Sequence, residues 1–117
     1  MSDEADAHLT IEMLDAADRV NAYLEPAGRE GFVGQGMVYD AVCLNLLRIG
    51  ECARLLSDRV KIRLPAIPWP DIVNLRHRVA HSYDTLKPDV LWLIASVSVP
   101  ELSRALRSLA ATPGDND

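Results

Sequence analysis

Three side chains between residues 76 and 83 have the types and the spacing needed for chemistry on phosphate groups. Arg76 is followed five positions later by His81, and Tyr83 comes two positions after the histidine. A guanidinium that keeps its charge, an imidazole that titrates near neutrality and a phenol can together serve phosphoryl transfer without a metal. The pattern R-x4-H-x-Y is short, so the elements around it must decide what it means.

We expect these residues on or just after a helix over residues 71–81, entered through a proline-stiffened segment with Trp69 packed beneath its start. At ~100° per residue, His77 and His81 lie side by side on one face. The opposite face is apolar and carries Ile72, Leu75, Val79 and Ala80. Arg76 and Tyr83 project on this apolar side. The residues from 84 to 88 follow the helix, so Tyr83 is expected past its end.

A purely structural interpretation of the same residues is also available. Arg76 could be anchored in the bundle by Glu51 or Asn45, because a core-facing charge must be paired. Tyr83 could be a core aromatic, and the two histidines could be surface residues. His77 and His81 could also bind a metal as an i,i+4 pair, but no third ligand is evident, so the sequence predicts neither a metal site nor a cofactor.

The rest of the chain predicts an all-α, up-and-down bundle of four to five helices, because no alternating strand pattern occurs. The first helix spans about 3–24 and breaks over 26–31, and the second spans about 37–57. The last helix opens near Thr85 or Leu86 with Pro88 in its first turn, and Pro100 should kink or break it at Ser98 to Val99. One domain over 1–110 and a disordered tail over 111–117 complete the expectation.

The second helix is apolar on two roughly opposite sides. One stripe holds Val38, Val42, Ile49, Ala53 and Leu56, and the other holds Met37, Leu44, Leu47 and Leu55. A small protein covers two such faces by placing the helix centrally and by adding a partner chain, so we expect a homodimer. Arg48 and Glu51 lie within the second stripe, where an intrahelical salt bridge would explain them.

Composition and charge narrow the class of protein. The 117 residues contain no apolar run long enough for a bilayer and no signal-peptide pattern at the start. Cys43 and Cys52 lie about 13 Å apart along one helix, too far for a disulfide, which is typical of a cytoplasmic protein. The net charge is −5, but residues 54–78 hold six basic residues against two acids, a stripe that could attract phosphates.

Four segments in order make the chain resemble the HepT-like toxins of the HEPN ribonuclease superfamily. Residues 49–56 (IGECARLL) are similar to the family's IGEA…L segment, and residues 64–73 to its P-x-IPW-x-x-I segment. The R-x4-H-x-Y motif follows, and residues 89–102 then match VW-x-I…P-x-L. The resemblance runs from about Gly31 to Leu109. His77 stands where the family usually has asparagine, and Ser82 where it usually has glycine.

The resemblance implies a HEPN-type bundle acting as a homodimer, in which the motif helices of two subunits line a shared cleft. It implies a metal-independent endoribonuclease that cleaves RNA and spares DNA, with His81 as acid or base and Arg76 stabilising charge on phosphoryl oxygens. His77 and Glu51 are expected to support the motif.

The family is the toxin half of type VII (HepT/MNT) toxin–antitoxin pairs, so it also implies a partner. A minimal nucleotidyltransferase antitoxin would silence the toxin by AMPylation, which adds AMP to Tyr83. The alternative is a non-catalytic HEPN module that dimerises and binds the nucleotidyltransferase. The acidic net charge and the His77 departure keep this alternative open.

Overall fold

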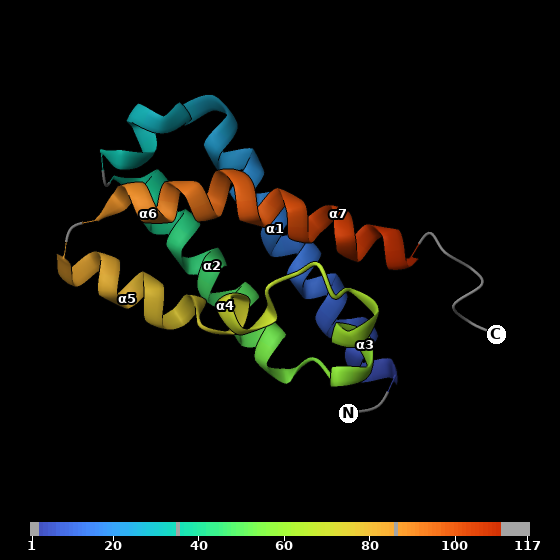
Figure 1. The fold of residues 1–117 in the computed structure, drawn as a ribbon. Helices are drawn as coiled ribbons and strands as arrows, with labels where there is room; N and C mark the ends of the chain where they lie inside the picture. The colour runs from blue at the N-terminus through green and yellow to red at the C-terminus, as the bar shows by residue number, and fades with distance from the viewer. Residues whose placement is uncertain (1–2, 35, 86, 111–117) are drawn as a thin grey trace.

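The computed structural model describes residues 3–34, 36–85 and 87–110, and within these ranges it contains helices and no strand. The long helices α1 (Asp3–Val33) and α2 (Met37–Leu55) run in opposite directions and pack along their length (Figure 1). The remaining elements are α3 (Asp58–Arg63), α4 (Trp69–Val73), α5 (Leu75–Thr85), α6 (Pro88–Leu93), the π-helical segment η1 (Ile94–Ser98) and α7 (Val99–Ala110). The predicted all-α, up-and-down bundle is confirmed.

The core lies between α1, α2 and the rod formed by α6, η1 and α7. Its fully buried side chains come from each of these elements and include Met13, Val20, Leu46, Ile49, Leu91, Leu102 and Leu106. Each such side chain contributes about 1.5–3 kcal/mol by leaving water. Helix α5 is added at one edge, where Leu75 and Val79 are buried against α2.

The predicted break after the first helix involves fewer residues than the sequence predicted. Gly28 alone departs from helical geometry, with φ 65° and ψ −177°, and the helix then resumes as far as Val33. A positive φ is readily adopted only by glycine, and Pro26 two residues earlier removes one backbone donor. The helix therefore bends at Gly28, whereas the sequence predicted an end near Leu24.

The predicted kink in the last helix is confirmed as a π-helical segment. Pro88 opens α6 in its first turn, as expected. Further along, the amide of Val99 donates to the carbonyl of Ile94, five residues back, and Pro100 follows directly. Proline has no N–H and crowds the preceding turn, so the widened segment η1 accommodates it without ending the helix.

The motif helix differs from its predicted bounds at both ends. It begins earlier, as α4, is interrupted at Asn74 (φ −84°, ψ 6°), and continues as α5 to Thr85, beyond the expected end at His81. The expectation that Tyr83 lies past the helix is therefore wrong for its backbone, because Ser82 does not break the helix. Trp69 is buried at the start of α4, as expected, where its indole N–H donates to the Leu64 carbonyl at 3.1 Å.

The second helix ends at Leu55, two residues before the predicted end, and the short helix α3 follows, which the sequence did not predict. The buried carboxylate of Asp6 accepts hydrogen bonds from the Ser57 amide (3.0 Å) and hydroxyl (2.6 Å), so it ties the residue before α3 to α1. Cys43 and Cys52 are free thiols, as expected. No helix in the described ranges could span a membrane, and the predicted tail over 111–117 lies outside them.

Candidate active site on α5

A glycine of α2 sets the position of the α4–α5 junction. A Cβ atom at Gly50 would lie 3.2 Å from the Leu75 Cβ, 3.3 Å from the Ile72 carbonyl oxygen and 3.5 Å from the Arg76 amide nitrogen. The first two of these separations are tighter than ordinary van der Waals contacts, so a side chain at this position would require the junction to shift by a few tenths of an ångström. The sequence analysis quoted Gly50 without giving it a role. The sequence did contain a signal for such a role, because a glycine inside a long helix costs about 1 kcal/mol relative to alanine. A glycine at such a position usually indicates close packing against another element.

Helix α5 presents Arg76 and both histidines to solvent. Leu75 and Val79 are buried, while Arg76, His77 and His81 are exposed. The two histidines thus face outward as predicted, but the expectation that Arg76 and Ala80 belong to the apolar side is wrong. Helix α5 packs at the edge of the bundle, so its buried face is narrower than the helical wheel suggested, and the residues at its margins emerge into solvent.

Arg76 is not held by either anchor that the structural interpretation required. Glu51 accepts hydrogen bonds from Arg54 (2.7 and 3.2 Å), and the side-chain oxygen of Asn45 accepts one from Arg48 (2.9 Å). Among the described residues, Arg76 has no hydrogen-bond or ion-pair partner. The hydrogen bonds from Arg54 lower the pKa of Glu51, and the charge of Arg76 lowers it further, so the two side chains lie near each other without a salt bridge.

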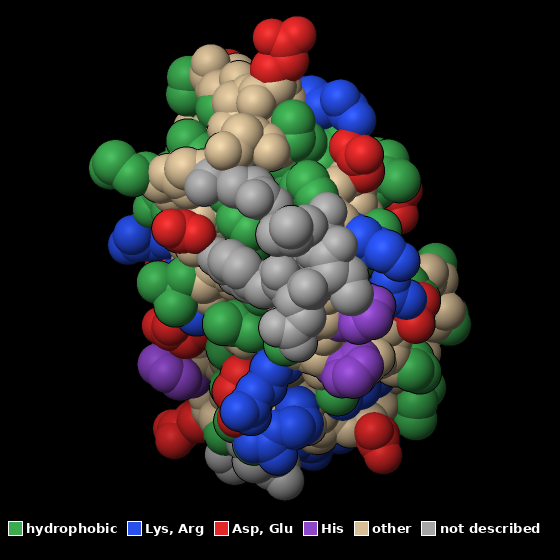
Figure 2. Space-filling view, turned by 90° about the vertical axis from the view of Figure 1, so that its left-hand side faces the viewer, with side chains coloured by type: hydrophobic (Ala, Val, Ile, Leu, Met, Phe, Trp, Pro, Cys, Tyr) green, Lys and Arg blue, Asp and Glu red, His purple; other side chains and the backbone are tan. Residues whose placement is uncertain are grey.

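His77 and His81 form a pair on the exposed face of α5. Their ring centroids are 6.4 Å apart and their planes differ by 8°. Figure 2 shows two histidine side chains side by side on this surface, with Lys and Arg side chains nearby. The structure therefore brings Arg76 and both histidines to one surface of one helix. Tyr83 shares the last turns of α5 by its backbone, and its side chain lies outside the described residues.

The predicted basic stripe is partly neutralised. Three of its members form ion pairs with carboxylates at 2.7–3.9 Å, namely Arg54 with Glu51, Arg59 with Asp3, and Arg78 with Asp71. A fourth, Lys61, places its ammonium 6.0 Å from the Trp69 ring. Arg76 lacks such a partner within the described residues. Its guanidinium, next to His77 in sequence, is therefore available to bind a ligand.

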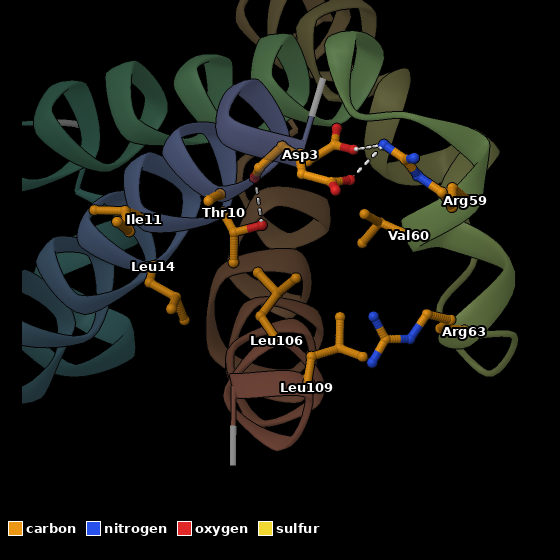
Figure 3. A pocket seen from close by; sticks show the side chains of 11 residues that line it. Asp3, Thr10, Ile11, Leu14, Arg59, Val60, Arg63, Leu106 and Leu109 are labelled. Carbon is orange, nitrogen blue, oxygen red and sulfur yellow. Dashed lines mark hydrogen bonds and ion pairs between the residues drawn. The ribbon is translucent and has the colours of Figure 1, made fainter. Parts of the chain in front are cut away.

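A groove on another part of the molecule does not contain the motif. It has a volume of about 740 Å³ and lies between α1, α3 and α7. Figure 3 shows its polar rim at Asp3 and Arg59 and its apolar wall at Ile11, Leu14 and Leu106. None of the predicted site residues lines it. The candidate site is thus an exposed helix surface and not a deep pocket.

Three of the four residues of the second apolar stripe of α2 are exposed, whereas Leu47 is partly buried and packs against the core. Met37 is 88% exposed, Leu44 is 61% exposed, and Leu55, at the other end of the helix, is 38% exposed. The predicted salt bridge between Arg48 and Glu51 is wrong. Arg48 instead reaches across to α1, where it binds Glu12 at 3.0 Å and Asp15 at 3.2 Å. The homodimer remains a prediction, and this uncovered face is the surface that motivates it.

Comparison with known proteins gives a consistent set of relatives. A family model described as "Ribonuclease HepT-like" matches residues 13–109. A protein of Methanocaldococcus jannaschii named "Putative RNase" is 27% identical over 93 residues, covering 80% of this chain and 85% of its own length. A "Probable ribonuclease HepT" of Thermococcus cleftensis is 24% identical over 98 residues, covering 84% and 89%. No solved structure matches the chain. The family model spans most of the chain, including α2, the motif helix and the rod, and the chain therefore belongs to the HepT-like ribonuclease family.

Proposed function

We propose that this chain is a metal-independent endoribonuclease whose Arg76 and His81 act on the RNA backbone. The observation that carries the proposal is the exposed surface of α5, which presents both side chains to solvent, with Arg76 unpaired among the described residues. An exposed arginine without an ion pair contributes little to the stability of the fold, so its guanidinium is available to a phosphate. Membership of a ribonuclease family supports the same conclusion.

The chemistry follows from the residue types. A neutral His81 imidazole would accept the proton of a ribose 2′-hydroxyl, and the 2′-oxygen would then form a bond to phosphorus. The bond from phosphorus to the 5′-oxygen breaks, and that oxygen takes a proton from an acid, which leaves a 2′,3′-cyclic phosphate and a 5′-hydroxyl. Proton transfer of this kind contributes about 10²–10⁴-fold. Arg76 would stabilise the negative charge that builds on the phosphoryl oxygens.

His77 and Glu51 have supporting roles in this proposal. His77 lies beside His81 and could serve as the second acid or base, or contact the substrate. Glu51 is held by Arg54 and lies near Arg76 without binding it, so it would steer the guanidinium through charge alone. Because Glu51 does not occupy the guanidinium, Arg76 can reach a phosphate.

The active unit that we propose is a homodimer joined through the exposed stripe of α2. Met37 and Leu44 are the most exposed large apolar side chains of that helix. Two copies of the same stripe form a self-complementary surface, as twofold symmetry requires. In this arrangement the α5 surfaces of two subunits would line one cleft, with two copies of Arg76 and His81.

We further propose that the chain is the toxin of a cytoplasmic toxin–antitoxin pair. Its partner would be a nucleotidyltransferase that adds AMP to Tyr83: the phenolic oxygen forms a bond to the α-phosphorus of ATP, pyrophosphate leaves, and the phenolic proton is lost. Tyr83 follows His81 by two residues on the same helix, about half a helical turn. A negative phosphate and a bulky adenosine there would repel and block RNA.

RNA cleavage in a chelating buffer tests the nuclease proposal. The purified chain with EDTA should cleave an RNA oligonucleotide and leave the all-deoxy oligonucleotide of the same sequence intact, because DNA has no 2′-hydroxyl. The products should carry 2′,3′-cyclic phosphate ends. A chain that binds a nucleotidyltransferase but cleaves no RNA would support the non-catalytic module instead.

A further inference from the structure

The exposed pair His77 and His81 has the geometry of a chelating site for a transition-metal ion. The two residues are four positions apart on α5, both are exposed, and their rings are nearly parallel with centroids 6.4 Å apart. Two imidazoles at this helical spacing can bind one ion together. With metal–nitrogen distances of about 2.0–2.1 Å, a tetrahedral ion would hold the ring centroids about 5–6 Å apart. Small side-chain rotations therefore suffice to close the site.

We propose that His77 and His81 bind Zn²⁺ and that the bound ion silences the nuclease. Imidazole nitrogen is a preferred ligand of zinc, copper and nickel, whereas magnesium prefers oxygen. Each imidazole has two nitrogens, so one can coordinate the ion while the other keeps a hydrogen bond. The silencing rests on the function proposed above, because the metal would take the lone pair that His81 needs to accept a proton.

The surroundings set the affinity of this site. Within the described ranges no group of three or more histidine, cysteine, aspartate or glutamate side chains could hold a metal, so water would complete the coordination shell. Arg76 and Arg78 flank His77 in sequence and repel a cation, although solvent screens exposed charges. The site should therefore be reversible and not the permanent cage of a structural zinc protein.

The chain offers matched controls, because it has only three histidines. His8 lies on α1 and is exposed, so its replacement tests whether any surface histidine contributes. Cys52 is the more accessible of the two thiols and tests whether sulfur binds the metal instead. His77→Asn and His81→Asn remove one ligand each and keep a polar side chain on an exposed surface, so both variants should fold, which circular dichroism would confirm.

Calorimetric titration of the tag-free chain with zinc chloride tests the site itself. We expect one ion per chain with micromolar affinity, weakened roughly tenfold or more in His77→Asn and in His81→Asn. Removing only the hydrogen-bond partner of a metal ligand already weakens metal binding by about 10–100-fold, and removing the ligand itself should weaken it at least as much. His8→Asn and Cys52→Ser should bind as the parent does. In NMR spectra of the unaltered chain, zinc should shift the imidazole signals of His77 and His81 and not those of His8. Unchanged affinity in His77→Asn, or a zinc-induced shift confined to His8, would overturn the site.

Zinc inhibition of RNA cleavage tests the silencing separately. The rate should fall as zinc rises, return when EDTA is added, and require roughly tenfold more zinc in His77→Asn, with each rate divided by that variant's own zinc-free rate. Cleavage that continues when the site is saturated would overturn the silencing and leave the site standing. A chain that binds zinc but never cleaves RNA, even in EDTA, would instead overturn the proposed nuclease and the silencing with it.

Discussion

Replacing Gly50 with alanine should disturb a close contact between the backbones of α2 and the motif helix. The added Cβ would stand 3.2 Å from the Leu75 Cβ and 3.3 Å from the Ile72 carbonyl oxygen. Neither atom is the end of a flexible side chain, so the α4–α5 junction itself must move by a few tenths of an ångström. Arg76 moves with it, because its amide nitrogen lies 3.5 Å from the same position.

Two opposing terms set the size of this effect. Forcing extra volume into a packed contact costs about 1–3 kcal/mol, while alanine gains about 1 kcal/mol over glycine in the interior of a helix. We expect a net loss of about 1 kcal/mol in the free energy of unfolding, and a melting temperature lower by about 3–6 °C for a domain of this size. The rate of RNA cleavage should also fall, by less than the 10²-fold that displacement of a catalytic group by about 1 Å can cost, because the junction moves by only a few tenths of an ångström.

Urea denaturation and cleavage kinetics of Gly50→Ala measure the two effects. Gly36→Ala is a control for the added volume, because a Cβ there meets no atom within 4 Å. Gly36 is the N-cap of α2, where alanine is less favourable than glycine, so that variant should lose up to about 1 kcal/mol but should cleave RNA at the parental rate. If Gly50→Ala were more stable than the parent and cleaved RNA at the same rate, the close approach would have no role in positioning Arg76.

Three further predictions concern other parts of the molecule. Burial raises the pKa of Asp6, but hydrogen bonds from Ser57 outweigh it and hold that pKa below its usual value. The stability that these hydrogen bonds contribute should be fully present above about pH 4 and be lost as the pH falls through the lowered pKa, as acid titration would show. Asp6→Asn should lower the free energy of unfolding by about 1–2 kcal/mol at pH 7, as urea titration would show. Leu44→Glu should keep the monomer fold and shift the mass by light scattering from twice 12.9 kDa to 12.9 kDa, whereas a monomeric parent would contradict the dimer. Tyr83→Phe should acquire no AMP in intact-mass spectra after incubation with the nucleotidyltransferase and ATP, and an adduct on this variant would place the modification elsewhere.

The sequence predicted the helical elements well because their signals are local. Pro88 marked the first turn of α6, and Pro100 marked the irregular segment before α7. The two apolar stripes of α2 also showed which of its faces would lack a covering helix. These features depend on the backbone chemistry and side-chain type of nearby residues, which a single chain displays directly.

Features set by distant contacts could not be predicted in the same way. The residue before α3 is held by Asp6, which lies 51 positions before Ser57 and accepts a hydrogen bond from its amide. Arg48 turned toward Glu12 on α1 instead of Glu51 on its own helix. The exposure of Arg76 depends on α5 lying at the edge of the bundle, which a helical wheel drawn for one helix does not contain. Gly50 gave a local signal, but its role appeared only once α4 and α5 were placed against it.

The cleavage rate of two active-site variants against two matched controls tests the central claim most directly. His81→Ala and Arg76→Ala should each lower kcat/KM for RNA in EDTA by about 10²–10⁴-fold and 10²–10³-fold respectively, with the free energy of unfolding within about 0.5 kcal/mol of the parent because both side chains are exposed. His8→Ala and Arg104→Ala, which replace exposed residues of the same types on α1 and α7, should cleave at the parental rate. Parental cleavage by His81→Ala or by Arg76→Ala would contradict the assignment of the active site to α5.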